Sequence, residues 1–148
     1  MVALDIGNVC MTIAPWAAAR KLGFASIRDL FAALPTMRRL VEDLETGRLA
    51  TEQFLDQASS MLPRLASRET LADAWLAILG DEIAGVGVWV DEMRERGLRP
   101  VFFSDTSELH FQALVCRLSF AERIAGAVLS YEVGCRKPAE EMYEVLED

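Results

Sequence analysis

The sequence predicts an α/β fold, in which a parallel sheet of three strands carries an inserted block of helices after its first strand. Short apolar runs at residues 2–4, 100–103 and 127–129 each lead into polar or turn-forming residues, as strands buried in a parallel sheet do. Helical patterns separate the later strands, which is the alternation that right-handed crossovers require. Residues 15–80, after the first strand, have a helical pattern and no convincing strand.

The block at residues 15–80 has the pattern of roughly four helices, preceded at residues 10–14 by a turn or a small hairpin. Gly47 is expected to end one helix, Thr51 to cap the next and Ser67 to cap a third. The helix before Gly47 has an apolar stripe with spacings of three and four: Met37, Leu40, Val41 and Leu44.

The later part of the chain returns to alternating helices and strands. A helix over residues 86–96 is expected to end at Gly97, and the strand after it runs into Ser104. Another helix follows before the third strand, which leads into a loop at residues 131–137. A final helix is expected to begin at Pro138, because proline suits the first helical turn.

The composition indicates a globular, cytoplasmic protein. The 148 residues are 52% hydrophobic and 26% charged, which is enough apolar material for a buried core and too much for a disordered chain. The longest apolar stretch, residues 83–90, is too short to span a membrane, and no secretion signal opens the sequence. Cys10, Cys116 and Cys135 lack zinc-site spacing, which favours free thiols in a reducing compartment. The net charge of −8 argues against a nucleic-acid partner.

Polar side chains follow the three predicted strands: Asp5, Ser104 and, after the third strand, Lys137. Because the carboxyl ends of parallel strands meet at one edge of the sheet, we expect these side chains around one crevice. A carboxylate can attack phosphorus and form an aspartyl-phosphate, while a hydroxyl and a lysine can hold the other phosphate oxygens. The set therefore favours transfer of a phosphoryl group.

Four stretches resemble the haloacid dehalogenase (HAD) superfamily of hydrolases. Residues 5–9 (DIGNV) are similar to its first motif, residues 101–105 (VFFSD) are similar to its second, and residues 129–138 (LSYEVGCRKP) are similar to its third. Residues 45–49 (ETGRL) are similar to a stretch typical of its helical cap. The residues after Asp5 are most similar to the branch that contains sugar-phosphate phosphatases such as glucose-1-phosphate phosphatase. The resemblance implies a Rossmann-like core at residues 1–14 and 81–148, with the cap at residues 15–80.

The resemblance also implies an activity and roles for individual residues. The expected protein is a phosphohydrolase that acts on a small phosphorylated metabolite, with sugar phosphates as one suggested class. Asp5 would be the nucleophile, and Ser104 and Lys137 would bind phosphate oxygens. Asn8 and Asp105, which lie in the first two motifs, are expected to contribute to substrate binding.

Magnesium is the cofactor that the resemblance implies, and the carboxylate of Asp5 and the carbonyl of Gly7 would hold it. Gly7 is also expected to contribute to substrate binding. Gly7 stands where most phosphatases of the family have a second aspartate, their general acid and base. The sequence stops at Asp148, before the family's acidic fourth motif. We therefore expect an incomplete metal site and an unpaired edge on the first strand, which favours pairing with a second copy of the chain.

Two other functions compete with a phosphohydrolase. A 2-haloacid dehalogenase would use Asp5 to displace halide from carbon, and that chemistry needs neither a metal nor a proton for the leaving group. A non-catalytic binding module is the alternative from another class, and the incomplete metal site supports it. The single histidine, His110, is expected to cap or pack a helix, and Trp75 and Trp89 are expected in the core.

Overall fold

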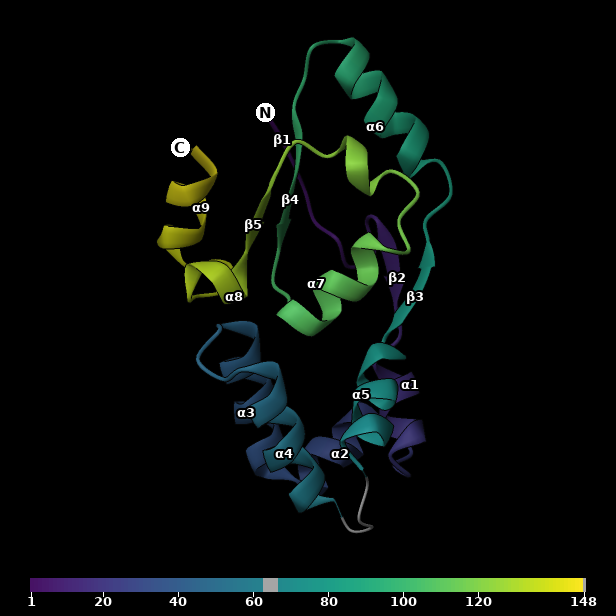
Figure 1. Ribbon diagram of the computed structural model, residues 1–148, viewed down its shortest axis with the longest axis vertical. Coiled ribbons are helices and arrows are strands. Elements are labelled where there is room, and N and C mark those ends of the chain that lie inside the picture. Colours follow the sequence, from purple (N-terminus) through teal and green to yellow (C-terminus); the bar gives the residue numbers. More distant parts are fainter. Residues whose placement is uncertain (63–66, 148) are drawn as a thin grey trace.

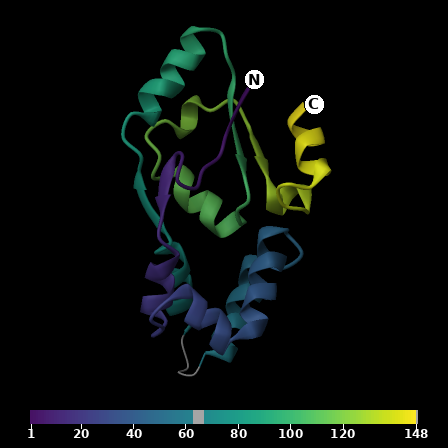
Figure 2. The same cartoon turned by 180° about the vertical axis from the view of Figure 1, so that it is seen from behind.

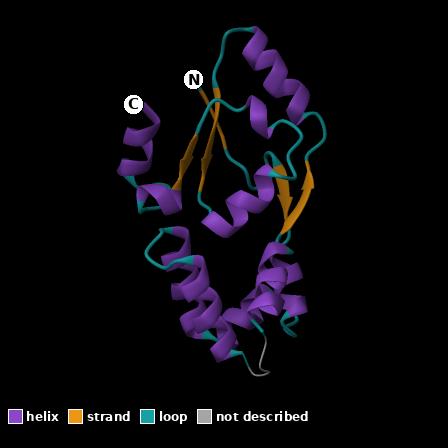
Figure 3. Cartoon of the chain, in the orientation of Figure 1, coloured by secondary structure: helices purple, strands orange, loops and turns teal. Residues whose placement is uncertain are grey.

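The computed structural model describes residues 1–62 and 67–147, which form two lobes (Figure 1). The described part of the helical lobe (residues 15–62 and 67–76) consists of helices and their connections, without strands. The remaining described residues form the sheet lobe and the two-stranded ribbon that joins it to the helical lobe (Figure 3). Seen from behind, the N-terminus and the end of the described chain both lie in the sheet lobe (Figure 2). Residues 63–66 of the predicted cap lie outside the described residues.

The sheet lobe is built around a three-stranded parallel sheet, as the sequence predicts. It consists of β1 (Val2–Leu4), β4 (Pro100–Ser104) and β5 (Ala127–Leu129) in the order β1-β4-β5. In the register, Leu4 lies opposite Phe102, and Ser104 lies opposite Leu129. Every residue of the central strand β4 is buried, which explains its uninterrupted apolar sequence up to Ser104.

Helices cover the sheet and complete the core of this lobe. They are α6 (Val86–Glu95), α7 (Glu108–Val115), the 3₁₀ turn η1 (Ala121–Arg123), α8 (Ser130–Val133) and α9 (Glu140–Glu147). Gly97, with φ of +74°, follows the end of α6 in the predicted place. The core combines residues from strands, helices and the turn before η1: Leu4, Met11, Val90, Phe102, Leu114 and Phe120.

Helix α8 corrects the prediction of a loop at residues 131–137. Ser130–Val133 forms one helical turn, ended by Gly134 with φ of +92°. A single turn is too short to show helical periodicity in the sequence. The last helix, α9, begins at Glu140, two residues after Pro138, which is within the usual uncertainty of helix boundaries.

An antiparallel ribbon of two short strands connects the lobes. The strand β2 (Met11–Ile13) pairs with β3 (Leu79–Glu82), so residues 10–14 form no local hairpin, and the predicted helical block ends in a strand. Gly80 hides this strand in the sequence, because glycine is unfavourable in strands. Its missing side chain makes room for Thr12, because a Cβ on Gly80 would overlap the Thr12 hydroxyl and lie 3.0 Å from the Thr12 carbonyl oxygen.

The helical lobe contains five helices among the described residues, where the sequence predicts roughly four. They are α1 (Pro15–Lys21), α2 (Ile27–Ala33), α3 (Pro35–Glu45), α4 (Thr51–Met61) and α5 (Arg68–Leu76). Ser67 caps α5 as predicted, accepting a hydrogen bond from the Thr70 amide. The predicted cap of α4 is wrong by one residue, because Ala50 occupies the capping position and Thr51 begins the helix.

The two tryptophans predicted in the core have different outcomes. Trp75 is buried in the helical lobe, where it packs against Phe54 with ring centroids 5.2 Å apart. Trp89 is 47% exposed, so its prediction is wrong. Helix α6 buries Val90 and Met93, and Trp89 lies next to that stripe, where the helix surface meets solvent.

Two further predictions concern the surroundings of the protein. None of the helices in residues 1–62 and 67–147 is both long and apolar enough to cross a membrane. Within the same residues β1 has a strand partner on one side, β4. Pairing of that edge with a second copy and a cytoplasmic location stay predictions.

Candidate active site between the two lobes

The candidate site lies where the parallel strands of the sheet lobe end. Asp5 directly follows β1, and Ser104 is the last residue of β4. Lys137 lies in the segment between α8 and α9, after the third strand. Parallel strands present their carboxyl ends at one edge, and the three predicted residues therefore come from three neighbouring chain segments at the same edge.

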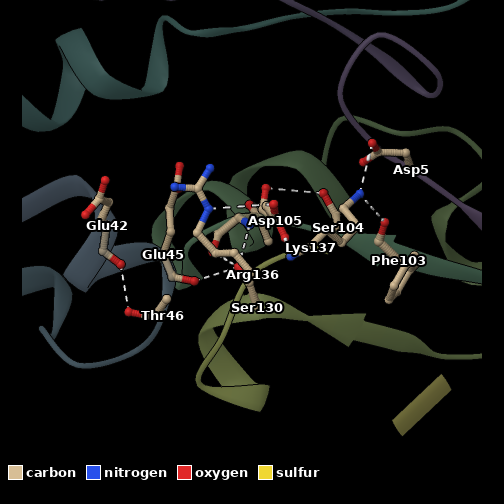
Figure 4. A network of polar contacts seen from close by, with 11 residues as sticks. Asp5, Glu42, Glu45, Thr46, Phe103, Ser104, Asp105, Ser130, Arg136 and Lys137 are labelled. Atoms are coloured by element: carbon tan, nitrogen blue, oxygen red, sulfur yellow. Dashed lines mark hydrogen bonds and ion pairs between the residues drawn. The ribbon is translucent and has the colours of Figure 1, made fainter. Parts of the chain in front are cut away.

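Lys137 connects two of these strand ends (Figure 4). Its Nζ lies 3.0 Å from Oδ2 of Asp5 and donates a hydrogen bond of 3.1 Å to the carbonyl of Phe103 in β4. The other carboxylate oxygen of Asp5 accepts a 2.8 Å hydrogen bond from the Ile6 amide. The Asp5 side chain is still 47% exposed, so a small molecule can reach the carboxylate.

Ser104 and Asp105 follow the central strand and have different surroundings. Ser104 is 3% exposed, and its hydroxyl makes a long contact of 3.4 Å with the Asp105 carbonyl. The Asp105 carboxylate accepts a 2.9 Å hydrogen bond from the Lys137 amide and lies 3.6 Å from Nε of Arg136. Asp105 therefore fixes the segment that carries Lys137, a contribution to the site beyond its predicted contact with substrate.

Gly7 and Asn8 shape the turn that follows Asp5. Asn8 adopts φ of +58°, a conformation that asparagine tolerates better than most residues. Its side-chain oxygen accepts a 3.1 Å hydrogen bond from the Ile13 amide, which ties the turn to β2. A Cβ on Gly7 would lie 3.3 Å from the Ile13 side chain, so the turn leaves little space for a larger residue.

A cavity of about 530 Å³ opens between the lobes at this edge of the sheet. All six residues that the sequence predicts for the site line it: Asp5, Gly7, Asn8, Ser104, Asp105 and Lys137. The structure therefore brings the predicted residues together, although they come from both halves of the sequence. Their individual roles stay predictions.

The helical lobe reaches the same cavity through Glu45, which the site prediction did not include. Nη1 of Arg136 lies 3.3 Å from a carboxylate oxygen of Glu45, and Arg136 also faces Asp105, so one guanidinium links the two lobes (Figure 4). The buried Ser130 hydroxyl donates a 2.6 Å hydrogen bond to the Glu45 carbonyl. Burial raises the pKa of Glu45, and the charge of Arg136 opposes this effect. The available sequence signal was that both charged residues lie inside stretches that resemble family motifs.

Comparison with known proteins identifies the fold that carries this site. No family model and no curated protein matches the sequence. Solved structures do: a HAD family enzyme of Bacteroides thetaiotaomicron has a TM-score of 0.83 at 20% identity, covering 97% of this chain and 74% of that one. A predicted HAD-like family hydrolase of Porphyromonas gingivalis has a TM-score of 0.76 at 21% identity, covering 97% and 72%. The chain has the HAD fold.

A more distant likeness, with the same fold, is to L-2-haloacid dehalogenase of Xanthobacter autotrophicus, with chloropropionic acid covalently bound in that structure. Its TM-score is 0.64 at 14% identity, covering 98% of this chain and 62% of that one. The Bacteroides enzyme has also been solved as a complex with magnesium and inorganic phosphate. The HAD fold is thus common to this chain, a magnesium-binding protein and a dehalogenase, and the predicted sugar-phosphatase branch stays a prediction.

Within this HAD fold, the described residues fit a magnesium site only in part. They contain no group of three or more histidine, cysteine, aspartate or glutamate side chains placed to hold a metal ion. Asp5 supplies one carboxylate, and Gly7 lines the same cavity with its backbone. Magnesium is often held by one or two carboxylates together with water and substrate phosphate oxygens. Asp5 and the Gly7 carbonyl therefore fit a site that water and substrate would complete.

His110 forms part of the cavity wall and is held as a packing residue. Its Nε2 lies 3.0 Å from the Trp75 carbonyl, and its ring stacks on the Trp75 ring at a centroid distance of 6.2 Å. Burial lowers the pKa of His110 below its usual value, which favours the neutral ring at pH 7. The prediction that this histidine packs a helix is confirmed.

Proposed function

We propose that the protein is a HAD-like phosphohydrolase that acts on a small phosphorylated metabolite through an aspartyl-phosphate on Asp5. The observation that carries the proposal is the Asp5 carboxylate, which is exposed to the cavity while its Oδ2 lies 3.0 Å from the ammonium of Lys137. Ser104 lines the same cavity from the end of the central strand. A nucleophile, a cation and a hydroxyl donor around one space are the groups that phosphoryl transfer requires.

In the proposed first step, a carboxylate oxygen of Asp5 attacks phosphorus and the bond from phosphorus to the ester oxygen breaks. The ester oxygen leaves with the bonding electrons and takes up a proton from water, which gives the alcohol. Lys137 offsets negative charge that develops on the phosphoryl oxygens, and the Ser104 hydroxyl donates to one of them. Water then attacks the acyl phosphate, which releases inorganic phosphate and restores the carboxylate. Magnesium, held by Asp5 and the Gly7 carbonyl, would supply further positive charge to the phosphoryl group.

A dehalogenase is the second candidate, and the apolar side chains that line much of the cavity favour it: Ile13, Ile27, Phe31, Val41 and Ile78. Asp5 would then attack the carbon that carries the halogen, the halide would leave with the bonding electrons, and water would hydrolyse the ester formed. The same nucleophile serves both reactions. The two proposals differ in the leaving group and in the need for a metal ion.

The test measures phosphate release from aryl and hexose phosphates, and halide release from 2-chloropropionate, each with magnesium and with a chelator. We expect chelator-sensitive phosphate release. Chelator-resistant halide release would instead support the dehalogenase. If neither product forms under any of these conditions, both enzyme proposals fail and a binding role replaces them.

Variants test the residues in the same assay. We expect Asp5→Asn to lower phosphate release by roughly 10³-fold or more and Ser104→Ala to lower it by about 10²–10³-fold. Asp73→Asn is the matched control, because Asp73 is exposed on α5 and does not line the cavity. Full activity in Asp5→Asn would contradict the proposed nucleophile.

A further inference from the structure

The cavity has two chemically different sides. The side formed by the sheet lobe carries the proposed nucleophile, Asp5, and the proposed phosphate-binding groups, Ser104 and Lys137. The side formed by the helical lobe and the ribbon that leads to it is mostly apolar: Pro15, Ile27, Phe31, Val41, Trp75 and Ile78. These residues come from α1, α2, α3, α5 and the segment after α5, so four helices contribute to one apolar wall.

The polar groups that the helical lobe contributes at this wall are already bonded within the protein. Glu45 lines the cavity from α3, and its carboxylate pairs with Arg136 at 3.3 Å. The Trp75 carbonyl lies 3.0 Å from the His110 ring nitrogen Nε2. Wall groups that could bind the hydroxyls of a sugar are therefore few among the described residues, and those present have protein partners.

The size of the cavity sets a further condition on the ligand. Its volume of about 530 Å³ is within the range of pockets that enclose drug-sized molecules, about 300–1,000 Å³. A phosphate ion alone would leave most of that volume to water against apolar side chains. A ligand that fills the cavity therefore needs an organic group that contacts the apolar wall.

We infer that the substrate is a phosphomonoester of an apolar alcohol, alkyl or aryl, and not a sugar phosphate. The inference rests on the proposed phosphohydrolase function and adds the class of leaving group. Sugar hydroxyls placed against this wall would lose water without gaining protein partners, which is unfavourable. Each methylene transferred from water to the wall is favourable instead, and it is equivalent to about a fourfold gain in affinity, or about 0.8 kcal/mol.

The experiment compares ethyl, butyl and hexyl phosphate with glucose 1-phosphate and glucose 6-phosphate as substrates. A second arm measures binding of ethyl-, butyl- and hexylphosphonate to the wild-type protein by calorimetry, which needs no turnover. We expect both kcat/KM and affinity to rise about fourfold per methylene. The hexose phosphates are expected to fall below butyl phosphate in kcat/KM.

Val41→Thr tests the wall directly, because threonine has nearly the shape of valine and adds a hydroxyl. We expect it to weaken hexylphosphonate binding by about threefold to tenfold and ethylphosphonate binding far less. Val88→Thr is the matched control, since Val88 is 64% exposed on α6 and lies outside the cavity. We expect this control to leave the whole series unchanged.

The two arms separate failure of this inference from failure of the proposed function. Phosphate release that does not depend on chain length, or that is fastest with a hexose phosphate, would overturn the apolar substrate and leave the phosphohydrolase standing. Chain-length-dependent phosphonate binding with no release of phosphate from any ester would leave the apolar wall standing and overturn the phosphohydrolase. If phosphonate affinity does not change with chain length and Val41→Thr has no effect on it, the apolar wall does not determine specificity.

Discussion

Gly47 is the residue whose substitution most directly tests how the helical lobe rests on the sheet lobe. It follows α3 with φ of +66°, and a Cβ added there would overlap the carbonyl oxygen of Tyr131 in α8. In Gly47→Ala the two backbones would have to separate by roughly 1 Å before van der Waals contact is restored. That separation would break the hydrogen bond from the buried Ser130 side chain to the Glu45 carbonyl.

The expected loss of stability has two parts. Alanine at a positive φ costs about 1–2 kcal/mol, and loss of the hydrogen bond made by the buried Ser130 side chain adds about 1–3 kcal/mol. Gly23→Ala provides the control, because Gly23 has φ of +86° and nothing within 4 Å of an added Cβ. We therefore expect unfolding free energies about 2–5 kcal/mol below wild type for Gly47→Ala and about 1–2 kcal/mol below it for Gly23→Ala.

Urea unfolding at equilibrium measures both variants. The close approach of the lobes is supported if Gly47→Ala loses clearly more stability than Gly23→Ala. Equal losses would refute it, because they would leave only the backbone conformation that the two glycines share.

Three further predictions use other residues of the site region. Ser130→Ala removes the acceptor of the buried Thr106 amide and should lower the unfolding free energy by about 1–3 kcal/mol in urea; an unchanged midpoint would contradict this. Burial lowers the pKa of His110, so as pH falls below about 6.5 the imidazole is protonated in the unfolded chain before it is protonated in the folded one, and the folded protein loses stability. The difference in unfolding free energy between wild type and His110→Gln, measured at pH 7.5 and 5.5, should show this loss. A difference that does not depend on pH would argue against it. Burial, with the charges of nearby carboxylates, raises the pKa of Cys10 to about 11, so iodoacetamide at pH 8 should modify the exposed Cys116 well before Cys10, as peptide mass spectrometry can determine.

The parallel sheet and the convergence of its strand ends could be predicted from the sequence. The central strand is buried on both faces and is therefore apolar up to Ser104, and the carboxyl ends of parallel strands must meet at one edge. Those two facts were enough to bring Asp5, Ser104 and Lys137 to one cavity. These two facts do not predict which residues of the helical lobe face that edge of the sheet.

Other features had no sequence pattern to reveal them. The strand β3 contains Gly80, which disfavours strands but permits a close backbone approach, and the single turn of α8 has no period. The pairing of Glu45 with Arg136 joins residues of different lobes. Such a contact depends on how the lobes pack, and neither helical nor strand periodicity encodes it.

The central claim is that Asp5 receives the phosphoryl group. Its most direct test is mass spectrometry of the protein quenched in acid during turnover of hexyl phosphate with magnesium, followed by peptide mapping. The account predicts one phosphoryl group on the peptide that carries Asp5, sensitive to hydroxylamine as an acyl phosphate is, and absent from Asp5→Asn. Phosphorylation of a different residue, or the same label in Asp5→Asn, would contradict the account.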